Sequence, residues 1–148
     1  MAPLLALVLG LLTARLAGLL GIDALDGWHP ALRIGLATMF VLTGLAHFVG
    51  RRRADLVAMV PPALPSPGLL VTITGVLELA SAVGLLLPPT APAAGGALAL
   101  LMLAMFPANV SAARRGLTLA GRPVTPIGAR TLLQAIYVGA AVAVAAGP

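Results

Sequence analysis

The chain has no cysteine and no lysine, and only 9% of its residues are charged. The missing cysteine excludes a disulfide, a thiol nucleophile and a thiolate metal site, so thiol chemistry would need a partner protein. Ordinary soluble domains carry roughly 25% charged residues. The low charge therefore excludes a water-soluble fold of 148 residues. The missing lysine fits a biased composition rich in alanine, glycine and leucine, and we draw no functional conclusion from it.

Recognisable catalytic patterns are also missing. The sequence contains no phosphate-binding loop, no Ser-His-Asp arrangement, no carboxylate dyad and no tandem repeat. His47 has no carboxylate at metal-ligand spacing, so no metal site is predicted there. No catalytic residue can be assigned, and we expect a protein that is not a catalyst by itself.

Long apolar runs dominate what is present, since 60% of the residues are hydrophobic. Five runs have the ~20 residues that a helix needs to cross a bilayer: residues 2–20, 30–49, 68–87, 93–113 and 126–146. The first lacks preceding basic residues and a following cleavage pattern, so we expect a retained helix. The sequence predicts an all-α, polytopic membrane helical bundle that forms a single transmembrane domain over residues 1–148.

The arginines give this bundle an orientation. Six of the nine basic residues fall between apolar runs on one side of the predicted membrane: Arg51, Arg52, Arg53, Arg114, Arg115 and Arg122. Basic loops face the cytoplasm, so the N-terminus is predicted inside and the C-terminus outside the inner (cytoplasmic) membrane. Beside membrane spans, arginines meet anionic lipid headgroups, and we expect the lipid bilayer rather than nucleic acid as their partner.

Residues 51–67 form a predicted cytoplasmic interfacial segment. Charged residues followed by apolar ones over residues 51–60 predict a short helix at the membrane surface, and the proline-rich residues 61–67 predict a stiff turn after it. The segment either docks a cytosolic partner or simply anchors the chain at the headgroups, and anchoring is the simpler interpretation.

Glu78 is the central candidate for function. It is the eleventh residue of its predicted span, ~15 Å from either boundary at 1.5 Å per residue. A carboxylate at that depth costs several kcal/mol unless it is paired, hydrated or protonated, so it should face the bundle interior. Gly75 and Ala82 lie on the same helical face and leave room for a cavity or a neighbouring helix.

Other spans contribute polar residues in the cytoplasmic half of the membrane: His47, Asn109, Arg130 and Gln134. Side chains tilt toward the N-terminus of their own helix, so in the predicted orientation His47 and Asn109 lean toward Glu78. We expect one polar intramembrane layer, which either binds a ligand or is an inert hydrogen-bonded network. Pro107 can kink its helix beside this layer and leaves the Leu103 carbonyl without its usual donor.

Two arginines could serve as the counterion of Glu78. Arg130 would extend toward the cytoplasm, which makes Arg15 the candidate counterion. Asp23, Asp26 and Trp28 offer Arg15 local partners as well.

Small residues recur at four-residue spacing in two predicted spans. They are Ala6, Gly10, Ala14 and Gly18 in the first and Ala135, Gly139 and Ala143 in the last. Such stripes let helix backbones approach closely, so both are predicted packing seams.

Four stretches together resemble the DoxX-like family of small membrane proteins. They are GLATMFVLTGLAHFVGRRR (35–53), MVPPALPSPGLLVTITGVLELASAVGLLLP (59–88), LALLMLAMFPANV (98–110) and RTLLQAIY (130–137). The order of G-x-x-H-F, T-G-x-x-E, P-A-N-V and R-x-x-x-Q carries the resemblance. It implies a four-helix core plus one extra N-terminal transmembrane helix, with His47, Glu78, Asn109 and Gln134 at the family's polar positions. The family includes redox-associated membrane subunits and an animal branch that assists receptor assembly.

Two functions follow as hypotheses. In the first, the protein is an accessory membrane subunit of a redox-associated system and holds a quinone or other lipophilic molecule in its polar layer, in contact with other membrane or redox proteins. In the second, it is a non-catalytic assembly or scaffold protein. A proton-coupled transporter is a weaker third hypothesis, since Glu78 is its sole obvious proton carrier and no inverted repeat is visible.

Overall fold

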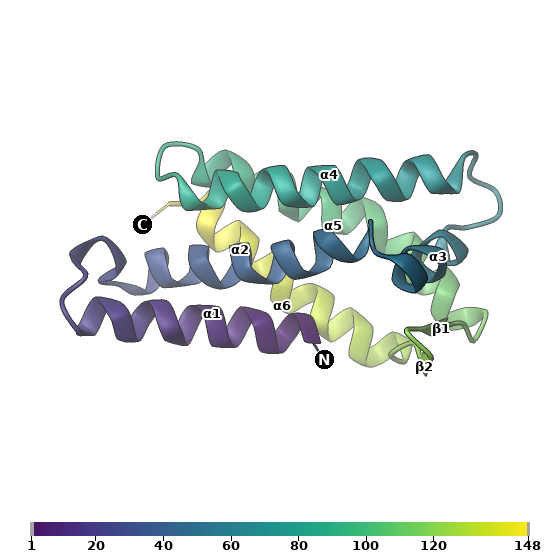
Figure 1. Ribbon diagram of the computed structural model, residues 1–148, viewed down its shortest axis with the longest axis horizontal. Coiled ribbons are helices and arrows are strands. Elements are labelled where there is room, and N and C mark those ends of the chain that lie inside the picture. The colour runs from purple at the N-terminus through teal and green to yellow at the C-terminus, as the bar shows by residue number, and fades with distance from the viewer. Residues whose placement is uncertain (1, 148) are drawn as a thin grey trace.

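The computed structural model describes residues 2–147, which fold almost entirely into helices (Figure 1). The elements are α1 (Ala2–Leu19), the 3-10 turn η1 (Asp23–Leu25), α2 (Trp28–Ala46), α3 (Gly50–Met59), α4 (Pro67–Leu86), α5 (Ala91–Arg114), β1 (Thr118–Leu119), β2 (Arg122–Pro123) and α6 (Ile127–Ala145). Five helices are long and apolar enough to cross a membrane: α1, α2, α4, α5 and α6. The predicted all-helical fold is confirmed.

Helix boundaries lie within three residues of the predicted spans. Helix α4 begins at Pro67, because proline is tolerated where no preceding carbonyl needs its N–H. Helix α2 ends at Ala46, before the predicted end at residue 49. The reason is that the N–H groups of His47 and Phe48 bond to the carbonyls of Gly44 and Leu45, three residues earlier, in a tighter turn that leads into α3. The short helix predicted over residues 51–60 is present as α3, and its place at the membrane surface stays a prediction.

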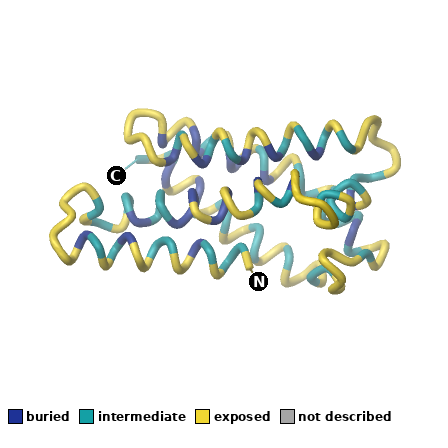
Figure 2. The backbone as a smooth tube through the Cα atoms, in the orientation of Figure 1, coloured by how far each residue is buried: buried dark blue, intermediate teal, exposed yellow. Residues whose placement is uncertain are grey.

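The helices pack in sequence order around a narrow core. Helix α1 lies along α2, α2 packs against α4, α4 against α5, and α5 against α6 (Figure 1). The largest fully buried side chains are Leu36, Met39, Leu85, Leu98 and Val144. Most of this core lies in the half of the bundle nearer the α4–α5 connection, where dark segments gather in Figure 2. The other half, where α6 begins, is less buried.

Only one of the two small-residue seams is used within the chain. A Cβ added to Gly35 would lie 2.7 Å from the Leu7 carbonyl oxygen, and one on Gly10 would lie 2.7 Å from Thr38 Oγ1, so α1 and α2 nearly touch there. The α6 stripe of Ala135, Gly139 and Ala143 is exposed. The prediction that this α6 stripe packs against another helix of the same chain is therefore wrong.

Two arginines bind the C-terminal ends of helices. Arg33 donates to the carbonyls of Leu85 (2.8 Å) and Leu86 (3.0 Å) at the end of α4. Arg115 donates to those of Ala58 (2.8 Å) and Met59 (2.9 Å) at the end of α3. The last carbonyls of a helix have no partner in their own helix, and a guanidinium offers several donors at once. These arginines therefore connect elements that are far apart in the sequence.

The predicted basic loops are largely structured. Arg51, Arg52 and Arg53 begin α3, and Arg114 ends α5. The two short strands β1 and β2 form an antiparallel hairpin that was not predicted. Its turn places Ala120 and Gly121 at positive φ (53° and 77°). Such turns usually have the sequence Asn-Gly, and the alanine at position 120 is the reason why the sequence did not predict this hairpin.

Candidate functional site

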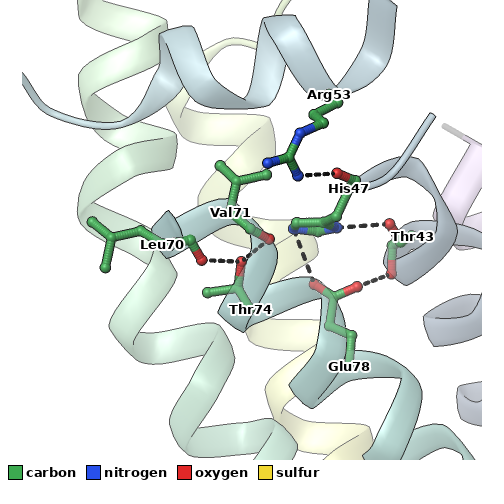
Figure 3. A network of polar contacts seen from close by, with 7 residues as sticks. All are labelled: Thr43, His47, Arg53, Leu70, Val71, Thr74 and Glu78. Carbon is green, nitrogen blue, oxygen red and sulfur yellow. Dashed lines mark hydrogen bonds and ion pairs between the residues drawn. The ribbon is translucent and has the colours of Figure 1, made fainter. Parts of the chain in front are cut away.

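The candidate site is a polar cluster between α2 and α4, made of Thr43, His47 and Glu78 (Figure 3). The side chains of His47 and Glu78 are only 5% and 4% exposed. Glu78 lies in the middle of α4, and His47 directly follows the last residue of α2. Two ionisable groups are thus held together in the interior of an apolar bundle.

Hydrogen bonds define the tautomer of His47. The Thr43 hydroxyl donates to Glu78 Oε2 at 2.6 Å, and His47 Nδ1 lies 2.9 Å from the Thr43 carbonyl oxygen. A carbonyl oxygen can only accept, so Nδ1 carries the hydrogen. In the neutral ring, Nε2 is then an acceptor, and it faces Glu78 Oε1 at 4.0 Å. Shortening this gap by about 1 Å would bring the two atoms to hydrogen-bond distance.

Once this gap closes to hydrogen-bond distance, His47 and Glu78 can share one proton. With the proton on the carboxyl group both side chains are neutral, and with the proton on Nε2 they form an ion pair. In either arrangement the pair has no net charge, which avoids the cost of an isolated charge in a low-dielectric interior.

Close helix packing surrounds the pair. A Cβ added to Gly75 would lie 2.5 Å from His47 Cβ, and one added to Gly44 would lie 2.9 Å from the Leu79 side chain and 3.3 Å from Glu78 Cβ. The sequence left open whether the small face of α4 borders a cavity or a neighbouring helix. The structure shows helix α2 packed against this face. Thr43 therefore bonds Glu78 directly, and His47 Nε2 faces Glu78 across a 4.0 Å gap.

Arg53 covers the cluster from the side of α3 (Figure 3). Its guanidinium donates to the carbonyls of His47 (2.8 Å) and Gly68 (3.1 Å) and to the Thr72 hydroxyl (3.0 Å). One side chain thus joins the end of α2 to the first turns of α4, and it sets the position of His47 through the backbone.

Asn109, Arg130 and Gln134 form a second polar group between α5 and α6. Arg130 donates to Asn109 Oδ1 (2.6 Å) and the Thr125 carbonyl (3.3 Å), and Gln134 donates to the Met102 carbonyl (2.7 Å). Arg130 thus bonds within the bundle instead of extending to the cytoplasm as predicted. Gln134 reaches the carbonyl one residue before Leu103, where Pro107 disturbs the helix.

The predicted single layer is therefore two groups. Within residues 2–147 no hydrogen bond or ion pair connects Asn109, Arg130 or Gln134 to the Thr43–His47–Glu78 cluster. In the same part of the chain, no three His, Asp or Glu side chains are placed to hold a metal ion.

Arg15 is not the counterion of Glu78. Its guanidinium pairs with Asp26 at 2.7 Å and lies 5.5 Å from the centre of the Trp28 ring. A local charge pair and a cation–π contact thus hold Arg15 near the C-terminal end of α1, while its buried Nε has no hydrogen-bond partner within residues 2–147. The nearest polar partners of Glu78 are Thr43 and His47.

Thr43 was missed by the sequence analysis. It lies one helical turn before His47, and this i, i+4 spacing was the available signal. Threonine in an apolar helix usually bonds to its own backbone, which gave no reason to single it out.

Two isosteric substitutions test the contact between Thr43 and Glu78. Thr43→Val removes the hydroxyl that donates to Glu78 and should lower the free energy of unfolding in detergent by about 1 kcal/mol. Thr74→Val is the matched control, because the Thr74 hydroxyl bonds only to the carbonyls of Leu70 and Val71 in its own helix. We expect less than about 0.5 kcal/mol for the control. Equal effects of the two substitutions would contradict the contact.

Comparison with known proteins gives one match. Residues 36–145 match the protein family described as a domain of unknown function, DUF8561. The match runs from the middle of α2 to the end of α6 and leaves out α1. No curated protein and no solved structure matches the chain.

Proposed function

The chain belongs to the DUF8561 family, and from the geometry of its site we propose that it is an accessory, non-catalytic membrane subunit of a redox-associated system. In this proposal the Thr43–His47–Glu78 cluster holds one proton inside the membrane for a quinone or similar lipophilic molecule. Two electrons come from a partner protein, and the cluster supplies or accepts one of the two protons that accompany them, while the second exchanges with water. The resemblance of residues 35–137 to DoxX-like proteins supports the redox association.

One observation carries the proposal: a carboxyl group and an imidazole ring lie 4.0 Å apart, both buried, at the junction of two apolar helices. Ionisable residues within membrane spans are costly and mark proton or substrate pathways. The Thr43 carbonyl holds the ring with Nε2 directed at Glu78. This arrangement allows proton exchange between the two side chains without a separated charge.

We also propose that the arginine-rich end of the bundle faces the cytoplasm of the inner membrane. Helix α3, the end of α5 and the β1–β2 hairpin lie together at one end in Figure 1. They bring Arg51, Arg52, Arg114 and Arg122 together, all of them exposed. This clustering supports an inside N-terminus and an outside C-terminus by the positive-inside rule.

Native mass spectrometry of the gently extracted protein, combined with a cellular assay, tests the function. Wild-type protein and the Thr74→Val control should retain a quinone-sized ligand and support function in cells, whereas Glu78→Gln should lose function in cells. Glutamine keeps the size and an acceptor for Thr43 but cannot carry the proton. Absence of a quinone, combined with full activity of Glu78→Gln, would reject the proposal.

A second function, as an assembly or scaffold protein, is favoured by the exposed stripe on α6. Ala135, Gly139 and Ala143 would let a partner helix approach closely, and only Ala141 and Val144 of α6 are buried. A photo-crosslinking residue at Ala135 should then capture a membrane protein. Capture of lipid alone would count against this second function.

A further inference from the structure

A shallow, open groove lies along the exposed surface of α5 near its arginine-rich C-terminal end. Its volume is about 570 Å³, and it is lined by Phe106, Pro107, Val110, Ser111, Arg114 and Arg115. Apolar residues line one end and arginines the other. Neither the proton-holding cluster nor the stripe on α6 uses this groove.

The depth of the groove matches a membrane surface. Helix α5 has 24 residues and is about 36 Å long at 1.5 Å per residue. The hydrocarbon core is about 30 Å thick, so the last turn of α5 reaches the headgroup region when the helix spans the bilayer. Phe106, Pro107 and Val110 then lie at the depth of acyl chains, and Arg114 at the depth of phosphates.

The two arginines of the groove differ in what they contact. Arg115 uses Nε for the Ser111 hydroxyl (3.1 Å) and Nη2 for the carbonyls at the end of α3. Arg114 is exposed, and within residues 2–147 its guanidinium has no hydrogen bond or ion pair. All N–H donors of the Arg114 guanidinium are therefore available to a ligand. The neighbouring Arg115 guanidinium is held in place by its hydrogen bonds.

We propose that this groove binds an anionic phospholipid, with an acyl chain along Phe106, Pro107 and Val110 and the headgroup phosphate on Arg114. A guanidinium matches the geometry of a phosphate, and the fixed positive charge of Arg115 adds attraction. Pro107 contributes to the hollow, because it carries little side-chain bulk. The chemistry requires both a negative headgroup and an apolar chain.

Native mass spectrometry of the full-length protein with added phosphatidylglycerol or phosphatidylcholine tests the site. Wild-type protein should retain more phosphatidylglycerol than phosphatidylcholine. Arg114→Gln should reduce the retained phosphatidylglycerol about fivefold, which corresponds to the ~1 kcal/mol typical of one basic residue at an anionic surface. Arg51→Gln is the matched control, since Arg51 is exposed at the same end but lies outside the groove, and it should lower phosphatidylglycerol retention much less than Arg114→Gln does.

A second variant tests the acyl-chain part of the groove. Val110→Trp fills the groove without changing charge and should lower retention of both lipids, while circular dichroism confirms that the helices are intact. The site is rejected if wild-type protein does not distinguish the two lipids, if Arg51→Gln and Arg114→Gln lose phosphatidylglycerol equally, or if Val110→Trp binds as wild type does.

Discussion

Arg53→Met is expected to lower the free energy of unfolding by about 3 kcal/mol, the largest loss among the side chains that we consider. The substitution removes a guanidinium that donates to two backbone carbonyls and one hydroxyl at distances of 2.8–3.1 Å. Each bond to a charged donor contributes roughly 1.5–3 kcal/mol, but the three are not additive, and water at the membrane surface replaces part of the loss. Denaturant unfolding of the detergent-solubilised protein measures the change.

Arg52→Met is the matched control for this prediction. It removes the same charge one residue away, where the side chain is exposed, and should change stability by less than about 0.5 kcal/mol. Arg53→Lys should recover only part of the loss, because an ammonium group cannot reach three acceptors in the geometry of a guanidinium. Similar stabilities of Arg52→Met and Arg53→Met would show that Arg53 contributes only charge.

Gly75→Ala is expected to destabilise the protein by about 2 kcal/mol and to displace His47 from Glu78. The new Cβ would lie 2.5 Å from His47 Cβ. Both atoms are attached directly to their backbones, so α2 and α4 must separate to make room. The substitution thus acts on stability and on the site through the same contact, and unfolding measurements detect the first effect.

Gly96→Ala provides the comparison for this glycine. Gly96 is also inside a helix, but a Cβ there meets nothing within 4 Å. Alanine favours a helix over glycine by about 1 kcal/mol, so Gly96→Ala should stabilise the protein. If Gly75→Ala stabilises it too, the close approach of α2 and α4 is wrong.

Much of the architecture could be predicted from the sequence, because hydrophobic length alone identifies membrane spans. The five spans were predicted within three residues, and charge followed by apolar residues identified α3. The central position of Glu78 in α4 followed from counting along its span. Its partner His47 was placed correctly, since helix direction determines which way a side chain leans.

The contacts of the arginines could not be predicted in the same way. A long, flexible side chain can reach toward water or back to a helix end, and the pattern of residues does not distinguish these outcomes. Arg130 was expected to extend to the cytoplasm but bonds to Asn109, and Arg15 bonds to Asp26 instead of Glu78. Thr43 was missed for a related reason, because only the packing of α2 on α4 directs its hydroxyl to Glu78. The split of the polar layer into two groups likewise follows from which helices pack together.

Infrared spectroscopy of Glu78 as a function of pH tests the shared proton most directly. The bands of the carboxylic acid and the carboxylate, assigned by their absence in Glu78→Gln, report the ionisation of this side chain. His47→Asn keeps a donor near Nδ1 for the Thr43 carbonyl but removes Nε2, which faces Glu78. The proposal predicts that His47→Asn moves the pH at which Glu78 ionises, whereas Thr74→Val leaves it unchanged. An unchanged titration of Glu78 in His47→Asn would contradict a proton shared between the two side chains.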